Sequence, residues 1–328
     1  MKNKIISYSL LLVVLISFFY LDMYDRERRA PTSFSDFSTV MENGKFYAYG
    51  TSSNQNNIPV KKSNNGQKYS YIGDAMPGEI SWASEGGIWA PNVYKVDGTY
   101  IMYFSAINRI SGKRDIGISI SKKPRGPFKP LRSILVSNDE LGGLIGPQHF
   151  IDSDGKKFIL YKNDGNSIGI KSSLWIQALS SDGLKVIDNP TKLLDNTEVV
   201  NPKNIKVSKH PTTIEGPVIV KAPDGKYVLF FAGNNYATSD YFTGYAISDK
   251  LKGPYKYIGP LITTLSSSKT GEEIVGPGIG DLMEVSPNKY YISLNGWVNG
   301  IGKKAGGHRE LFHRYVSFEN GHTPKIFN

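Results

Sequence analysis

Glu215 is the acidic residue whose surroundings most clearly call for a chemical explanation. It lies between Ile214 and a Gly-Pro pair, directly before the apolar stretch "VIVKAPDGKYVLFFAG". A carboxylate beside an apolar side chain at the start of a strand risks a desolvation cost. Such burial raises the pKa of a carboxyl group, which can then donate a proton near neutral pH. The alternative is an inward-pointing carboxylate that pairs with a nearby lysine.

The other reactive residue types form no comparable arrangement. The chain has no cysteine, which excludes a disulfide framework and a thiolate zinc site. Its histidines show no spacing typical of metal ligands. They are His149, His210, His308, His313 and His322. The net charge of +10 comes from Lys and Arg spread along the chain, so a basic solvated surface is favoured and we expect no nucleic-acid partner.

A repeated pattern predicts the elements that position Glu215. Five stretches, starting at residues 42, 96, 153, 223 and 286, each contain a turn followed by an aromatic-rich strand. Their turn residues are 54, 57, 70 and 63 positions apart, which suits four-stranded units that each supply one sheet. The turn residues are Gly44, Gly98, Gly155, Gly225 and Asn288. The sequence therefore predicts an all-β fold, a five-bladed β-propeller over residues 31–328 without a second domain, and we expect a monomer.

The N-terminal 30 residues are predicted to form a separate segment, an export or membrane-anchor element with its linker. Residues Ile5 to Leu21 are uncharged and mostly apolar, and Lys2 and Lys4 precede them. This run is at the short end of the roughly 17 to 25 residues that span a bilayer. No A-x-A-like cleavage site follows, which favours an uncleaved anchor helix over a cleaved signal helix. We expect an extracytoplasmic protein that is membrane-anchored through this segment or secreted.

Four segments resemble, in order, those of family-43 glycoside hydrolases, the arabinanases, arabinofuranosidases and xylosidases. They are "SDFSTVMENGKFYAYGTSS", "GGIWAPNVYKVDGTYIMYFSA", "IEGPVIVKAPDGKYVLFFAG" and "GGHRELFHRYVSFENGHTPKI". The resemblance spans roughly residues 34 to 326. It implies a five-bladed propeller that hydrolyses arabinose- or xylose-containing oligo- or polysaccharides.

The resemblance also implies roles for two carboxylates. Glu215 corresponds to the general acid, and Asp36 in "FSDFST" to the base that activates a water molecule. That arrangement implies inversion, with carboxyl groups roughly 6.5 to 9.5 Å apart. Taken alone, Asp36 would be interpreted as a turn or cap residue.

The chain departs from the family pattern at a third carboxylate, which precedes a proline and is thought to tune and orient the acid. In this sequence Gly146 precedes Pro147 at the matching place. Asp139, Glu140 or Asp281 could approach the pocket instead, and the spacing selects none of them.

The remaining site candidates each have a structural alternative. Trp89 and Trp297 could stack on a sugar ring or could pack between blades. Arg309 matches an arginine that the family often carries near the substrate, and could also be a surface cation. Ile279 stands where many members have a metal-binding histidine, so we expect no metal site and no cofactor, with an axial calcium ion as the alternative.

Two classes of function remain open at this stage. The first is an inverting glycoside hydrolase, which the presence of Asp36 and Glu215 favours. The second is a catalytically impaired propeller that binds glycans, which Gly146 and Ile279 favour. A propeller can serve either function, so the fold alone does not separate them.

Overall fold

The protein was analysed as a computed structural model, which describes residues 29–203 and 205–328. The predicted anchor segment, Ile5 to Leu21, lies outside these residues. Within the described ranges, no helix has both the length and the apolar character needed to cross a bilayer.

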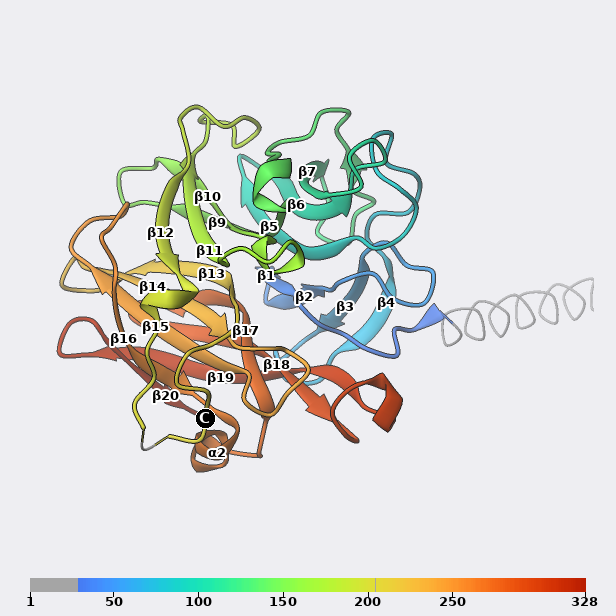
Figure 1. The fold of residues 1–328 in the computed structure, drawn as a ribbon. Helices are drawn as coiled ribbons and strands as arrows, with labels where there is room; N and C mark the ends of the chain where they lie inside the picture. The colour runs from blue at the N-terminus through green and yellow to red at the C-terminus, as the bar shows by residue number, and fades with distance from the viewer. Residues whose placement is uncertain (1–28, 204) are drawn as a thin grey trace, which may run out of the picture.

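The described chain folds into five four-stranded sheets, each built from consecutive antiparallel strands (Figure 1). Blade 1 contains β1 (Ser38–Glu42), β2 (Lys45–Tyr49), β3 (Pro59–Ser63) and β4 (Ser70–Asp74). Blade 2 contains β5 (Trp89–Val96), β6 (Thr99–Ile107), β7 (Arg114–Ser121) and β8 (Lys129–Pro130). Blade 3 contains β9 (Leu144–Ile151), β10 (Lys157–Asn163), β11 (Ser173–Ala178) and β12 (Thr191–Asp195). Blade 4 contains β13 (Ile214–Lys221), β14 (Tyr227–Gly233), β15 (Phe242–Ser248) and β16 (Lys256–Ile262). Blade 5 contains β17 (Val275–Ser286), β18 (Lys289–Val298), β19 (His308–Glu319) and β20 (Thr323–Phe327).

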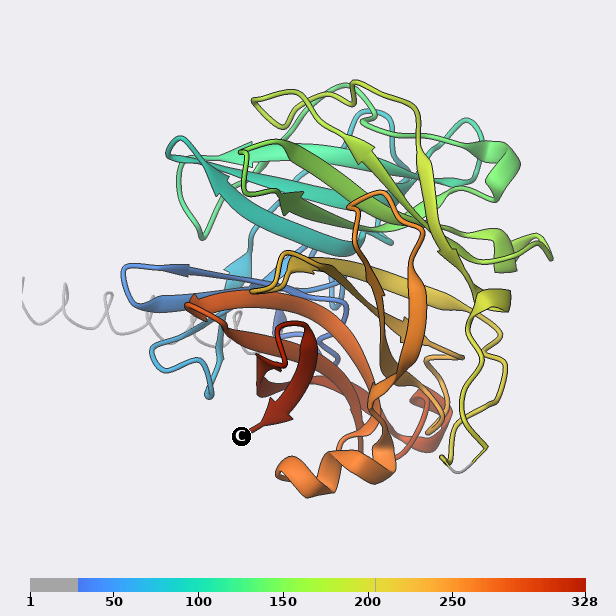
Figure 2. The same cartoon turned by 90° about the vertical axis from the view of Figure 1, so that its left-hand side faces the viewer.

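The prediction of an all-β five-bladed propeller is confirmed. The first strand of each blade lies innermost, and these five strands contact their neighbours around a common axis (Figure 1). The five predicted turn residues all lie between the first and second strands of their blades. Within the described chain the only α-helix is α2 (Thr264–Ser267), at the edge of the molecule (Figures 1 and 2).

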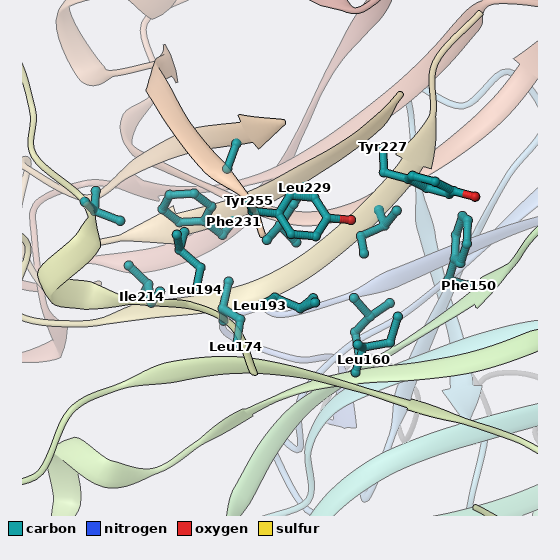
Figure 3. Close-up of a cluster of buried hydrophobic side chains, with 14 of the residues drawn as sticks. Phe150, Leu160, Leu174, Leu193, Leu194, Ile214, Tyr227, Leu229, Phe231 and Tyr255 are labelled. Atoms are coloured by element: carbon teal, nitrogen blue, oxygen red, sulfur yellow. The ribbon is translucent and has the colours of Figure 1, made fainter. Parts of the chain in front are cut away.

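Apolar side chains fill the spaces between neighbouring blades, because each sheet alternates residues between its two faces. Figure 3 shows the cluster between blades 3 and 4, where Leu160 and Leu174 face Ile214 and Leu229. Similar clusters join blades 1 and 2, 2 and 3, and 4 and 5. This packing fixes the angles between the innermost strands that carry the candidate site.

The boundary between blades 5 and 1, here called the seam, depends more on polar contacts. The Asp281 carboxylate of β17 accepts hydrogen bonds from the Ser38 hydroxyl, at 3.0 Å, and from the Thr39 N–H, at 2.8 Å. The N–H of Leu282 donates to the other carboxylate oxygen. Burial raises the pKa of Asp281 to about 6, although these three hydrogen bonds oppose the rise. Asp281, one of the residues considered for the pocket, therefore holds the seam.

The raised pKa of Asp281 predicts a pH-dependent stability. The native state favours the protonated form, so this contribution is fully present below the ordinary pKa of 3.8 and is lost as the pH rises through about 6. At about 1.4 kcal/mol per pKa unit, the loss amounts to about 3 kcal/mol. Urea unfolding between pH 4 and pH 7 should show wild type losing this stability relative to Asp281→Asn, which cannot titrate. A difference that stays constant with pH would contradict the prediction.

Candidate active site

A left-handed residue at the start of each blade determines where the candidate side chains point. These residues are Asp36, Ala90, Gly146, Gly216 and Gly276, with φ angles between 46° and 63°. Next to them, the pairing with the second strand changes register in blades 2, 3, 4 and 5. Such a bulge bends the strand and redirects its side chains. Glu215 and Trp89 occupy equivalent places, one residue before the left-handed position of their blades.

Asp36 is held by hydrogen bonds to residues of blades 1 and 5. Its N–H donates to the Asn295 side-chain oxygen at 2.8 Å, and its Oδ1 lies 3.2 Å from Nη1 of Arg309. Its Oδ2 accepts from the hydroxyls of Ser35, at 3.3 Å, and Thr51, at 3.4 Å. The side chain is nevertheless 37% exposed. A water molecule can therefore reach this carboxylate, as a general base requires.

Glu215 does not have the purely apolar environment that its sequence neighbours suggested. Ile214 is fully buried, but the Glu215 side chain is 25% exposed. Its Oε1 accepts a hydrogen bond from the Tyr241 hydroxyl at 2.8 Å, and its Oε2 lies 3.4 Å from Nζ of Lys162. The lysine contact that the sequence left as an alternative is thus present, beside an accessible carboxylate.

Arg309 connects the two carboxylates. It is 7% exposed, pairs with Asp36, and lies with its guanidinium 5.9 Å from the centre of the Tyr241 ring. Burial alone would lower the pKa of Arg309, but Asp36, Tyr241 and Glu215 outweigh it, so the pKa lies above its usual value. Its buried Nη2 has no hydrogen-bond partner among the described residues. Nη2 is enclosed by protein, so Arg309 acts on the candidate site through Nη1 and through its charge.

Contacts between charged and aromatic groups continue around the axis through blades 2 and 3. The Arg114 guanidinium stacks on Trp89, 3.2 Å from the ring centre. Burial lowers the pKa of Arg114 to about 10, and Asp164 opposes this fall. Asp164 in turn lies 3.6 Å from Nζ of Lys162, which is 2% exposed. All five blades therefore contribute to one connected set of polar groups that surrounds the candidate site.

Gly146 leaves open the place where the family pattern has a carboxylate. A Cβ atom built there would have the Gly216 nitrogen, at 3.9 Å, as its nearest non-adjacent neighbour. The left-handed φ of 63° favours glycine, yet Asp36 adopts a similar φ of 49°. Lys162 pairs with Ile145, the residue before Gly146. The region thus gains a cation where the resemblance implies an anion.

The two tryptophans differ in how far a ligand could reach them. Trp89 is 39% exposed, and Arg114 covers part of it. Trp297 is 8% exposed, and its indole N–H donates to the Tyr236 carbonyl at 2.7 Å. Trp89 has the surface that a sugar-stacking role needs, whereas the position of Trp297 favours packing.

Trp89 yields a prediction about substrate binding. Trp89→Ala should raise KM about fivefold with a smaller change in kcat, because a stacked ring contributes on the order of 1 kcal/mol. Trp89→Phe keeps an aromatic face and should retain most of the affinity. Steady-state kinetics on a cleavable glycan would measure both, and equal KM values for all three proteins would contradict a stacking role.

The described residues offer no clear place for a metal ion. They contain no group of three or more His, Cys, Asp or Glu side chains that could hold one. Ile279 is buried in β17, with 3% of its surface exposed. Asp139 and Glu140 are exposed on the short 3-10 helix η1 (Asp139–Leu141) and make no contact with Glu215 that the structure records.

Sequence reasoning missed four residues that contact the carboxylates: Lys162, Tyr241, Thr51 and Ser35. Lys162 left a detectable signal, since it lies in the stretch "KFILYKN" (157–163), where a buried strand would normally continue with apolar residues. Tyr241 and Thr51 lie in ordinary polar loop sequence and gave no such signal.

The fold and the site together define a class. A five-bladed propeller with an aspartate and a glutamate at the starts of innermost strands, joined by a buried arginine, has the parts of a glycoside hydrolase. The sequence profile of the glycosyl hydrolases family 43 matches residues 30–324. The chain belongs to this family.

Comparison with individual proteins also finds glycoside hydrolases. The chain is 24% identical over 249 residues to "Extracellular endo-alpha-(1->5)-L-arabinanase 2" of Bacillus subtilis, covering 68% of this chain and 50% of that protein. It is 29% identical over 197 residues to "Extracellular endo-alpha-(1->5)-L-arabinanase" of Thermotoga petrophila, covering 56% and 40%. The chain thus matches half or less of the length of these relatives. Among solved structures, a thermostable family-43 glycoside hydrolase superposes with a TM-score of 0.74 at 25% identity, over 90% of this chain and 93% of that one.

Proposed function

We propose that this protein is an inverting glycoside hydrolase that cleaves glycosidic bonds in arabinose- or xylose-containing glycans. The observation that carries the proposal is the connection of Asp36 and Glu215 through Arg309 and Tyr241. Two accessible carboxylates on different blades, joined in this way, can act on one sugar from two sides. Family membership and the arabinanase relatives support the choice of pentose-containing glycans.

In the proposed reaction, Glu215 gives its proton to the glycosidic oxygen as the bond to the anomeric carbon breaks. Asp36 removes a proton from a water molecule, whose oxygen attacks the anomeric carbon from the opposite face. One direct displacement produces a hemiacetal of inverted configuration and a free alcohol. Arg309 supports this reaction, because its Nη1 holds and orients Asp36.

A second candidate function is glycan binding without turnover. The Lys162 cation beside Glu215 favours it, because an ion-paired carboxylate is a poorer proton donor. The open position at Gly146 favours it as well, since the third carboxylate of the family pattern is missing there.

The proposal includes a location outside the cytoplasm. The two arabinanase relatives are named as extracellular proteins. The apolar run from Ile5 to Leu21 is proposed to direct export and to hold the chain at the membrane. Membrane fractionation of tagged full-length protein, with N-terminal sequencing, would test this, and a mature chain that begins after residue 21 would contradict anchoring.

The deciding experiment is a screen of the full-length protein, in mild detergent, on nitrophenyl pentosides, arabinan and xylan. We expect release of reducing sugar from at least one of them. Proton NMR of the first product should show the anomer opposite to that of the substrate. If the protein binds a glycan, cleaves none of the panel, and binds equally well after Glu215→Gln and Asp36→Asn, the hydrolase proposal is wrong.

A further inference from the structure

The end of the propeller opposite the candidate site, here called the base, is unevenly charged. Strands within each blade are antiparallel, so the turns between the first and second strands and between the third and fourth strands all lie at the base. In Figure 2 the blue β1–β2 turn projects from this end of the molecule. In blades 1 and 2, Lys95 pairs with Glu42 at the base, and Asp97 is the other acid there. Six further exposed cations lie in or beside the turns of these two blades: Lys45, Lys68, Lys122, Lys123, Arg125 and Lys129.

The base of blades 3, 4 and 5 also carries cations, but acids neutralise many of them. Five ion pairs with N–O distances between 2.5 and 3.2 Å lie there: Lys156–Asp154, Lys221–Asp152, Lys226–Asp249, Lys252–Asp188 and Lys325–Glu319. In blades 1 and 2, the one ion pair that the described residues form at the base is Lys95–Glu42, at 2.8 Å. The excess positive charge of the base therefore lies on blades 1 and 2.

A hollow between blades 1 and 2 brings three of these cations together. It has a volume of about 320 Å³, and Lys45, Lys95 and Lys122 line it together with the rings of Tyr47 and Tyr100. The side chain of Lys45 is exposed and forms no hydrogen bond or ion pair with any other described residue. An anionic group that enters the hollow meets more positive charge than Glu42 offsets.

The start of the described chain indicates what lies close to blade 1. The side-chain amides of Asn54 and Asn56, in the β2–β3 loop, donate to the carbonyls of Ala30 and Arg29, both at 2.7 Å. Eight residues separate Arg29 from Leu21, the end of the apolar run, and they reach at most about 28 Å. A chain anchored through that run therefore keeps blade 1 close to the bilayer surface.

We propose that the base of blades 1 and 2 binds the anionic headgroups of a lipid bilayer, so that the candidate site at the opposite end faces away from the membrane. This inference rests on the proposed location of the protein at a membrane, and it does not depend on hydrolysis. The unpaired cations, such as Lys45 and Lys123, bind lipid phosphate groups. Each cation near an anionic bilayer increases the affinity about fivefold, and salt weakens the attraction.

Amine-reactive labelling of the full-length protein tests this orientation. The protein is placed in lipid nanodiscs of phosphatidylcholine alone, or of phosphatidylcholine and phosphatidylglycerol in equal amounts. Labelling of Lys45 and Lys123, measured by mass spectrometry, should be at least fivefold lower in the anionic nanodiscs, and high salt should remove the difference. Lys206 and Lys209 are exposed in the loop between blades 3 and 4, at the end that carries Glu215, and should be labelled equally in both. Equal labelling of Lys45 and Lys123 in the two kinds of nanodisc would overturn the proposal.

Charge reversal tests whether the cations themselves cause the protection. In Lys45→Glu/Lys123→Glu, the neighbouring Lys122 should be labelled equally in the two kinds of nanodisc. Lys206→Glu/Lys209→Glu changes the net charge by the same amount at the opposite end of the propeller and should keep the wild-type protection. Thermal melting checks that both variants fold. Loss of protection in both double variants would show that net charge alone is responsible, and would overturn a specific role of the base.

Flotation separates the base from the anchor. If the full-length protein is not anchored, it should still float with phosphatidylglycerol vesicles at low salt and should not float with phosphatidylcholine vesicles. The Lys45→Glu/Lys123→Glu protein should lose this flotation. Stronger protection of the base lysines by soluble polyphosphate than by anionic nanodiscs, at equal phosphate concentration, would overturn the proposal in favour of a soluble polyanion. None of these measurements uses hydrolysis, so the hydrolase proposal and the base can fail independently.

Discussion

Glu215→Gln and Asp36→Asn should each lower kcat/KM on a natural oligosaccharide about a hundredfold to ten-thousandfold. Each change removes one proton-transfer group, and general acid or base catalysis contributes about 10²- to 10⁴-fold. Both replacements preserve side-chain shape. The glutamine can still accept a hydrogen bond from the Tyr241 hydroxyl, and asparagine tolerates the left-handed conformation of position 36. Steady-state assays together with thermal melting would separate lost chemistry from lost structure.

Leaving-group dependence distinguishes the two roles. The dinitrophenolate group of a dinitrophenyl glycoside leaves without being protonated. Glu215→Gln should therefore lose far less activity on this substrate than on the oligosaccharide. Asp36→Asn should lose similar activity on both substrates, because the water still needs a base. Glu284→Gln, at an exposed position near the end of β17, serves as the control and should behave as wild type. An equal loss on the two substrates for Glu215→Gln would show that Glu215 is not the acid.

The second large effect concerns Lys162 and Gly146, two positions that change the charge near Glu215. Lys162→Met should raise kcat/KM on a natural oligosaccharide, because it removes the cation 3.4 Å from Oε2 of the group proposed to donate a proton. Gly146→Asp should act in the same direction by adding an anion.

Lys162→Arg is the matched control for this prediction, since it keeps the positive charge and should retain the wild-type kcat/KM. Thermal melting distinguishes an electrostatic role from a structural one, because a structural defect lowers the melting temperature together with the activity. If wild type lacks turnover, activity that appears in the Gly146→Asp/Lys162→Met double variant would support the same electrostatic explanation. Lower activity in Lys162→Met, with a melting temperature equal to that of wild type, would refute it.

The sequence predicted the fold well because the propeller repeats its local signals. Each blade has a turn between its first two strands. A glycine such as Gly98 or Gly155 indicates that turn from the local sequence alone, without information about the tertiary structure. The environment of the site was less predictable. The contact between Lys162 and Glu215 joins positions 53 residues apart, in the second strand of blade 3 and the first strand of blade 4. Only the packing of two blades brings them together, and no local pattern contains that information.

The roles assigned to Asp36 and Glu215 remain predictions, and the structure adds the reason to test them as a pair. Trp89 illustrates a different limit. The segment around it matched a motif of the family, but its exposure depends on the position of Arg114, which belongs to the third strand of the same blade. Burial and charge at such positions follow from tertiary contacts, which single-sequence patterns do not specify.

The seam between the last and first blades has a consequence for when this protein becomes competent during its synthesis. Asp36 pairs with Arg309 across 273 positions, and the Phe34 N–H donates to the Arg309 carbonyl at 2.8 Å. A growing chain can complete blades 2, 3 and 4, with Glu215 in place, before the partner of Asp36 has been made. The two halves of the site therefore meet only when blade 5 closes the ring. Recovery of activity during refolding should accordingly lag behind the fluorescence change that reports burial of aromatic residues between the middle blades.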